Sequence, residues 1–174
     1  MHLIRSLLTS LLLGASTAVS AGDVRIGSVE KNGMQVGAVY IQPVTMEPML
    51  PGMAQPADIH LEADIHALRD NPQGFREGDW IPYLSISYTI SKQGSDWTRS
   101  GILMPMAAND GPHYASNLKL DGAGKYRLRY HIKPPPYAAF HRHSDRETGV
   151  APWWAPFDLE WDFIYVGVGK KGGY

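Results

Sequence analysis

Cysteine is absent from the 174 residues of this chain. The fold therefore depends on its core alone, without disulfide bonds. The absence also excludes every metal site that is built on thiolate ligands, which removes zinc fingers, iron–sulfur clusters and blue copper centres. Any metal ion that this chain binds must be held by nitrogen, oxygen or thioether sulfur atoms.

Three further absences reduce the range of functions that the chain could have. No stretch reaches the ~18 consecutive apolar residues of a membrane-spanning helix, so we expect no membrane insertion. The formal net charge is -1, which gives no reason to expect nucleic acid as a partner. The sequence has no Gly-x-Ser-x-Gly turn and no thiol nucleophile, and we expect a binding protein rather than an enzyme.

The first 21 residues are typical of a secretory signal peptide. A weakly basic start with Arg5 precedes the short apolar run Leu7–Leu13, and Val19-Ser20-Ala21 is a small-residue cleavage site. No cysteine is available there for a lipid anchor. We therefore expect residues 22–174 to form one exported domain, long enough to bury a core.

Apolar and polar residues alternate with period two along the rest of the chain. Glycine, proline, asparagine or aspartate bounds each alternating run, and no window has a convincing helical period. This pattern predicts an all-β fold, an immunoglobulin-like antiparallel β-sandwich. Tyr126 stands two residues before Leu128, as in the tyrosine corner of such sandwiches. The predicted strands cover residues 36–41, 60–66, 84–90, 126–133 and 159–165.

The most distinctive segment is His60-Leu61-Glu62-Ala63-Asp64-Ile65-His66. As a strand, it places two imidazoles and two carboxylates on one face, because successive side chains point to opposite sides. A helix would also bring these groups together at a spacing of four. The prolines and glycines on both sides favour the strand. Carboxylate and neutral imidazole are good ligands for first-row metals, so a divalent cation would stabilise this polar row.

Two other segments offer metal donors. Met106 and His113 flank the turn Asn109-Asp110-Gly111, which could bring a thioether and an imidazole together as a hairpin does. His141 and His143 lie in a polar stretch after three consecutive prolines. Mixed imidazole, thioether and carboxylate donors suit copper in either oxidation state and also ferrous iron.

The residues alone leave other interpretations open. The row of polar side chains at 60–66 could be the solvated face of a half-buried strand. Glu62 and Asp64 could act as an acid–base pair on a sugar, with tryptophans as stacking platforms. The chain could also be an immunoglobulin-like adhesion or assembly module whose histidines are incidental.

The whole predicted mature chain resembles the periplasmic high-affinity ferrous-iron transport proteins, a family of copper- and iron-binding immunoglobulin-like proteins. Four motifs carry the resemblance: His-Leu-Glu-Ala-Asp-Ile-His at 60–66, Gly-Asp-Trp-Ile-Pro-Tyr-Leu at 78–84, Met-Pro-Met through Asp-Gly-Pro-His-Tyr at 104–114, and Arg-His-Ser-Asp at 142–145 followed by Glu-Thr-Gly-Val.

The resemblance implies a set of metal ligands. It favours Met106 over Met104 and His143 over His141, which the residues alone do not distinguish. Asp64, His66 and His141 remain candidates for a secondary site. The implied ligands are His60, Glu62, Met106, His113 and His143.

The resemblance also implies the biological role. We expect a periplasmic homodimer of a bacterial iron-uptake system that binds Fe2+ and Cu2+ and passes iron toward an inner-membrane permease. The alternative is a periplasmic copper-handling chaperone that uses the same ligands and another delivery partner.

Overall fold

The computed structural model describes residues 22–49, 55–135 and 140–168. The predicted signal peptide at 1–21 lies outside the described residues. Eight strands and no helix are present in the described part, which confirms the all-β prediction. The strands are β1 (Val24–Lys31), β2 (Met34–Ile41), β3 (Ile59–Ala67), β4 (Ser85–Lys92), β5 (Thr98–Ala108), β6 (Gly111–Leu118), β7 (Gly124–Lys133) and β8 (Phe157–Tyr165).

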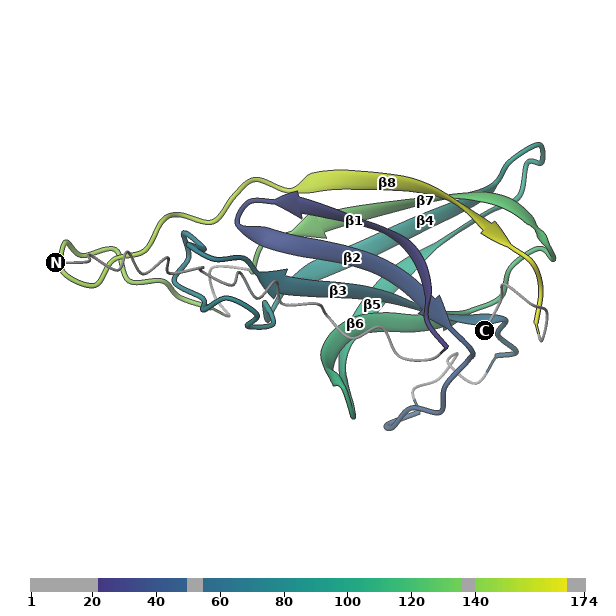
Figure 1. Cartoon of the computed structure of the whole chain (residues 1–174), viewed down its shortest axis with the longest axis horizontal. Coiled ribbons are helices and arrows are strands. Elements are labelled where there is room, and N and C mark those ends of the chain that lie inside the picture. The colour runs from purple at the N-terminus through teal and green to yellow at the C-terminus, as the bar shows by residue number, and fades with distance from the viewer. Residues whose placement is uncertain (1–21, 50–54, 136–139, 169–174) are drawn as a thin grey trace, which may run out of the picture.

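All neighbouring strands are antiparallel, in the order β1-β2-β3-β6-β5-β4-β7-β8. Strand β5 joins the two halves, because its first part pairs with β4 and its second part pairs with β6. The sheet therefore folds over itself into a sandwich that is nearly closed. Figure 1 shows the closing strands β1 and β8 lying side by side. Within the described residues, no helix is long and apolar enough to cross a membrane.

The core is formed by the inward face of each strand. On β7, residues Tyr126, Leu128, Tyr130 and Ile132 are fully buried, as their alternation predicts. The tyrosine corner is confirmed, because the Tyr126 hydroxyl donates a hydrogen bond of 2.6 Å to the carbonyl oxygen of Gly122.

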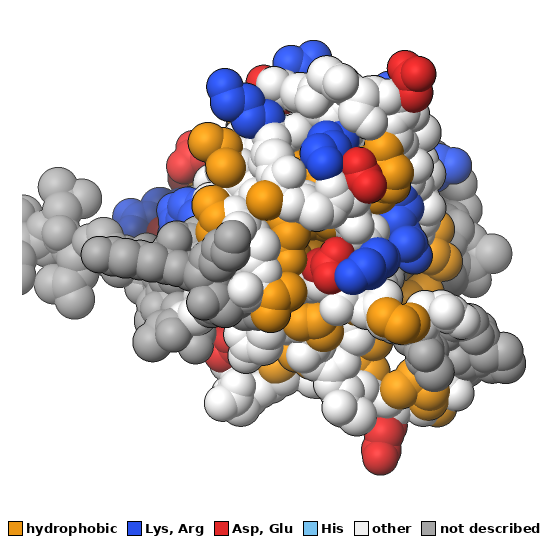
Figure 2. All heavy atoms as spheres, turned by 90° about the vertical axis from the view of Figure 1, so that its right-hand side faces the viewer, with side chains coloured by type: hydrophobic (Ala, Val, Ile, Leu, Met, Phe, Trp, Pro, Cys, Tyr) orange, Lys and Arg blue, Asp and Glu red, His pale blue; other side chains and the backbone are white. Residues whose placement is uncertain are grey.

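The outward face of the sandwich is charged but balanced. Arg127 on β7 lies opposite Asp162 on β8, with 2.8 Å between Nε and Oδ1. Lys119 pairs with Asp58, with 2.6 Å between Nζ and Oδ1. Figure 2 views the right-hand end of the molecule in Figure 1, where acidic side chains lie beside basic ones with hydrophobic side chains between them.

Strand β3 lies in the interior of its half of the sheet, between β2 and β6. The helical alternative for residues 60–66 is wrong, and the period-two reading is confirmed. Leu61, Ala63 and Ile65 are fully buried in the core. The four polar side chains of the segment therefore share the opposite face of β3, where β6 and the β5–β6 hairpin supply the neighbouring residues.

Candidate metal centre

Three side chains converge on the outer face of β3. His60 and Glu62 come from β3, and His113 comes from β6; one potential ligand atom of each lies within 4.8 Å of the others. The register explains this, because Glu62 is paired with Ala115 of β6 and His113 is the next residue of β6 on the same face. Two strands that are far apart in sequence thus bring two nitrogen donors and one oxygen donor together.

His60 is only 1% exposed. Its Nδ1 lies 2.8 Å from Oδ1 of Asn117, and its Nε2 lies 3.8 Å from Oε1 of Glu62. The rings of His60 and His113 meet edge to face, with 6.0 Å between their centroids. Burial lowers the pKa of His60, with the nearby His113 acting in the same direction. The imidazole is therefore neutral at neutral pH, which is the form that binds metal ions.

The carboxyl group of Glu62 is also buried. Burial, together with repulsion by the carboxylates of Asp64, Asp23 and Asp110, raises its pKa to about 8. Burial likewise raises the pKa of Asp64. The solvated-face interpretation of this row is therefore wrong for His60 and Glu62. A buried carboxyl group of this kind gains most from a cation, because a positive charge offsets both its desolvation and the repulsion by its neighbours.

The β5–β6 hairpin places the thioether candidate beside this group. Met106 is the direct cross-strand partner of His113, and the strands are joined at the turn that the sequence indicates. Met104 is paired with Ala115. It lies two residues before Met106 on β5 and therefore on the same face. The hairpin expectation for Met106 and His113 is confirmed, and the choice of Met106 as the ligand remains a prediction.

The remaining predicted ligand lies elsewhere in the chain. His143 is exposed on the connection between β7 and β8, where its Nδ1 is 2.7 Å from Oγ1 of Thr148. His141 is exposed on the same connection. Neither belongs to the group formed by His60, Glu62 and His113 among the described residues. A single copy of the chain therefore assembles part of the predicted ligand set.

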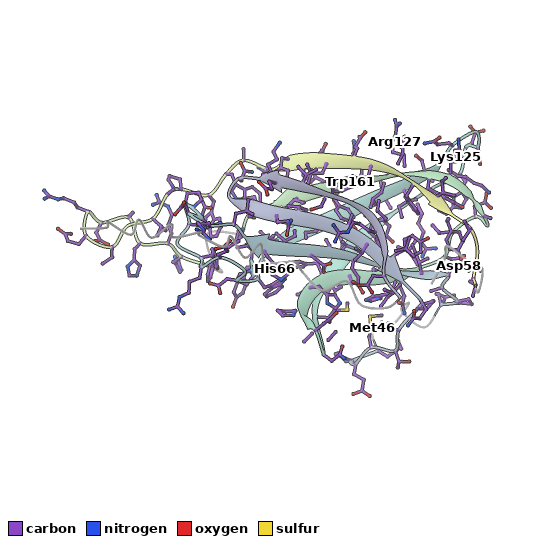
Figure 3. The ribbon with its side chains drawn as sticks, viewed as in Figure 1. Met46, Asp58, His66, Lys125, Arg127 and Trp161 are labelled. Atoms are coloured by element: carbon purple, nitrogen blue, oxygen red, sulfur yellow. The ribbon has the colours of Figure 1, made fainter. Side chains whose placement is uncertain are left out.

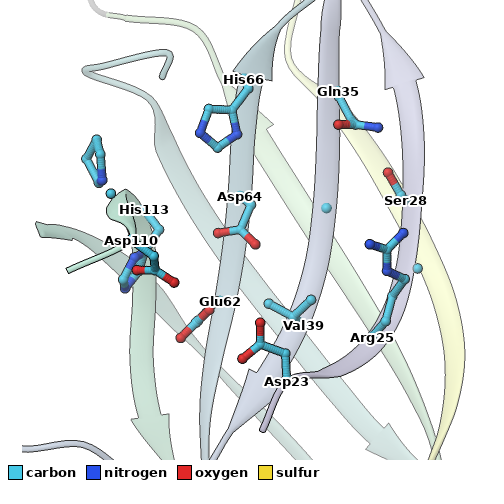
Figure 4. A pocket seen from close by; sticks show the side chains of 14 residues that line it. Asp23, Arg25, Ser28, Gln35, Val39, Glu62, Asp64, His66, Asp110 and His113 are labelled. Carbon is cyan, nitrogen blue, oxygen red and sulfur yellow. The ribbon is translucent and has the colours of Figure 1, made fainter. Parts of the chain in front are cut away.

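A cavity of about 290 Å³ opens next to the converging side chains. Figure 4 shows Glu62, Asp64 and His66 in a row along β3, with His113 on one side and β1 and β2 on the other. In Figure 3, His66 marks the end of this row on β3. Asp64 and His66 thus line the cavity beside the candidate centre.

Three charged lining residues were not singled out as candidates from the sequence. Asp23 reaches the cavity from the position before β1, Arg25 from the start of β1, and Asp110 from the hairpin turn. The sequence could have indicated Asp110, because it lies in the turn between the two hairpin donors. No sequence pattern indicates Asp23, since its position depends on the pairing of β1 with β2.

This arrangement is suited to a first-row divalent cation. It joins two imidazoles, of which His60 is neutral, with a largely buried carboxyl group. The neighbouring strand β5 carries the thioether of Met106 alongside. Imidazole and carboxylate donors hold iron, copper and zinc, and a thioether adds affinity for copper in its lower oxidation state. The cavity next to the group provides a route for a small cation to reach it.

Solved structures of bacterial proteins share this fold. FetP of uropathogenic Escherichia coli strain F11 is 49% identical, with a TM-score of 0.80, over 86% of this chain and 100% of that chain. It was expressed recombinantly in the periplasm of E. coli. Copper-reconstituted P19 of Campylobacter jejuni is 46% identical, with a TM-score of 0.80, over 86% of this chain and 100% of that chain. A copper-bound FetP variant with glutamine in place of one glutamate is 50% identical, with a TM-score of 0.79, over 84% of this chain and 99% of that chain.

Comparison with other sequences also finds bacterial relatives of this chain. A UPF0423 protein of Brucella abortus is 48% identical in an alignment of 176 positions that covers 97% of this chain and 96% of that protein. The 34 kDa membrane antigen of Treponema pallidum is 42% identical in an alignment of 137 positions that covers 74% of this chain and 66% of that protein. A family model described as Fe2+ transport protein matches residues 20–167. The chain belongs to the Fe2+ transport protein family.

Proposed function

We propose that this protein captures Fe2+ in the periplasm at the centre around His60, Glu62 and His113 and passes it toward an inner-membrane permease. The observation that carries the proposal is the burial of three potential donors within 4.8 Å of one another in a chain of the Fe2+ transport family. Burial of two imidazoles beside a carboxyl group does little for packing, and it becomes favourable when a cation joins them.

The donors have different tasks in this proposal. His60 and His113 supply nitrogen atoms that any first-row divalent cation accepts. Glu62 supplies a hard oxygen that suits iron, and Met106 supplies a soft sulfur that suits copper. The FetP variant with glutamine in place of one glutamate is copper-bound, so FetP does not need that carboxylate to hold copper.

His143 completes the centre from a second copy in this proposal. The connection that carries His143 does not bring it to the other donors within one chain. We infer a homodimer in which each protomer lends His143 to its partner. Such an exchange is natural for a twofold dimer, because the same contact then occurs twice.

A copper-handling chaperone is the second candidate function. The copper-bound relatives favour it. Copper affinity does not separate the two functions, since almost any site of this kind binds Cu2+ more tightly than Fe2+. Growth under limitation of one metal, or excess of the other, does separate them.

The test uses protein matured in the native periplasm. Metal content is measured for the wild type and for a variant in which His60, Met106, His113 and His143 are all replaced by alanine. The matched control is His131→Gln, because His131 lies on β7 and is paired with Asp158. We expect the fourfold variant to lose its metal and its host to grow poorly only under iron limitation. A defect only under copper stress would establish the chaperone instead, and equal metal in all three proteins would refute the site.

A further inference from the structure

Asn117 joins the candidate centre to the segment that follows β2. It is the direct cross-strand partner of His60 and lies on the same face. Its Oδ1 is 2.8 Å from Nδ1 of His60. The same amide also contacts the backbone of Val44 through both of its ends. Asn117 is therefore a shared partner of a candidate ligand and of the segment at residues 42–49.

The backbone of Val44 determines which way the amide points. The Nδ2 group of Asn117 donates to the carbonyl oxygen of Val44 at 2.7 Å, and Oδ1 accepts from the Val44 N–H group at 3.3 Å. A reversed amide would place an acceptor against an acceptor and a donor against a donor. The oxygen of Asn117 is therefore the atom that faces His60.

The orientation of the amide then determines the state of His60. An amide oxygen only accepts hydrogen bonds, so Nδ1 of His60 must carry the proton. In a neutral imidazole, the lone pair is then on Nε2, the nitrogen that lies on the side of Glu62. A histidine that is free in water favours the opposite tautomer, so this contact selects the less common one.

We propose that Asn117 is a positioning residue that holds His60 in the Nδ1–H tautomer and so commits Nε2 to the metal ion. The inference rests on the proposed role of His60 as a ligand. The same amide also contacts the segment at residues 42–49, which carries Met46. Met46 and Asn117 line a common small cavity, and Figure 3 shows Met46 in the segment below the sheets.

The test combines ring-nitrogen NMR of metal-free protein with competition titrations using Cu2+. Asn117→Leu removes both halves of the amide. Asn117→Asp keeps an acceptor for His60 and removes the donor to Val44. The matched control is Asn71→Ala, because Asn71 is also buried and also bonds backbone, the carbonyl oxygen of Gly33 at 2.8 Å, without contacting the centre. His60→Ala tests the ligand itself.

We expect Asn117→Leu to shift His60 toward the Nε2–H tautomer and to weaken Cu2+ binding by about 10- to 100-fold, the usual effect of losing a partner of a ligand histidine. Asn117→Asp should retain the Nδ1–H tautomer and bind Cu2+ no more weakly than the wild type. Asn71→Ala should change neither property. If Asn117→Leu does not fold, the Asp variant decides, and weaker binding or a changed tautomer in it would overturn the proposal.

Two further results would overturn the inference in different ways. An unchanged tautomer or an unchanged Cu2+ affinity in Asn117→Leu, with binding lost in His60→Ala, would refute the positioning role and leave the ligand intact. Unchanged Cu2+ affinity in His60→Ala would refute the ligand itself, whatever the tautomer of His60 in the Asn117 variants.

Discussion

His60 and Glu62 lie side by side on β3, with 3.8 Å between Nε2 and Oε1, and burial drives both groups toward their neutral forms. Burial lowers the pKa of the imidazole and raises the pKa of the carboxyl group to about 8. At neutral pH, the metal-free pair is therefore no ion pair. It is a pair of uncharged groups that a cation can convert into ligands.

The stability of the metal-free protein should fall as the pH rises from about 6.5 to 8. The carboxyl group of Glu62 has an ordinary pKa of 4.5 and a folded pKa of about 8, so in this range the unfolded chain lacks a proton that the folded chain keeps. Asp64, whose pKa burial also raises, acts in the same direction. We expect a decrease on the order of 1 to 3 kcal/mol in the free energy of unfolding, measured by urea denaturation.

The control for this pH dependence is Glu62→Gln. The glutamine variant should show a flatter dependence from about pH 6.5 to 8. Below about pH 6.5, the lowered pKa of His60 acts in the opposite direction in both proteins, because the unfolded chain then binds a proton that the folded chain resists. Identical pH dependences in the two proteins would contradict a proton held on Glu62.

Glu62→Gln should also change the relative affinity of the centre for Fe2+ and Cu2+. Loss of the carboxylate oxygen removes the hard donor and leaves the imidazoles of His60 and His113. We expect Fe2+ binding under anaerobic conditions to weaken by about tenfold or more, since even the loss of a partner outside the ligand shell costs about 10- to 100-fold. Cu2+ binding should change much less. Equal losses for both cations would contradict the division of tasks between the donors.

Complementation between two inactive variants should reveal the shared centre. One variant is His143→Ala, and the other carries alanine at both His60 and His113. Each should lack metal alone. After exchange of protomers in an equal mixture, about a quarter of the wild-type metal content should return, because half of the dimers then hold one complete centre.

The control for the complementation is Arg146→Ala, which alters an exposed residue of the same connection between β7 and β8. It should keep the metal content of the wild type. If the mixture of the two inactive variants binds no metal, His143 does not act across a dimer.

Gly27→Ala should weaken the closure of the sandwich. Gly27 lies on β1 beside a register shift, and a methyl group there would collide with the indole ring of Trp161 on β8. We expect a loss of about 1–3 kcal/mol in the free energy of unfolding, as for other overpacked sites. Gly37→Ala on β2 is the control, since its methyl group would meet its nearest atom, the carbonyl oxygen of Asp64, at an ordinary 3.5 Å. An equal effect of both substitutions would contradict the close contact between β1 and β8.

Tyr126→Phe should cost about 0.5–1.5 kcal/mol, the net value of one hydrogen bond. The hydroxyl group that is lost donates to Gly122 across the turn before β7. Tyr83→Phe is the control, because the Tyr83 side chain is exposed. Thermal unfolding of the three proteins measures the difference, and equal midpoints would mean that the tyrosine corner adds no stability.

Local features of the sequence were enough to predict much of the centre. The alternation at 60–66 depends only on neighbouring residues, and so it placed His60 and Glu62 on one face. The turn at 109–111 joined Met106 to His113 for the same reason. The tyrosine corner could be predicted because Tyr126 bonds to a residue only four positions away.

The sequence by itself therefore determined five of the eight strands, the faces of these strands, and the hairpin between Met106 and His113. Only the tertiary structure decided that β3 lies between β2 and β6, that His60 and Glu62 are buried, and that Asp23 and Asn117 stand next to them. Strand order depends on contacts between residues that are distant in the chain, and it is selected by the packing of the whole core. No periodicity within one segment contains that information.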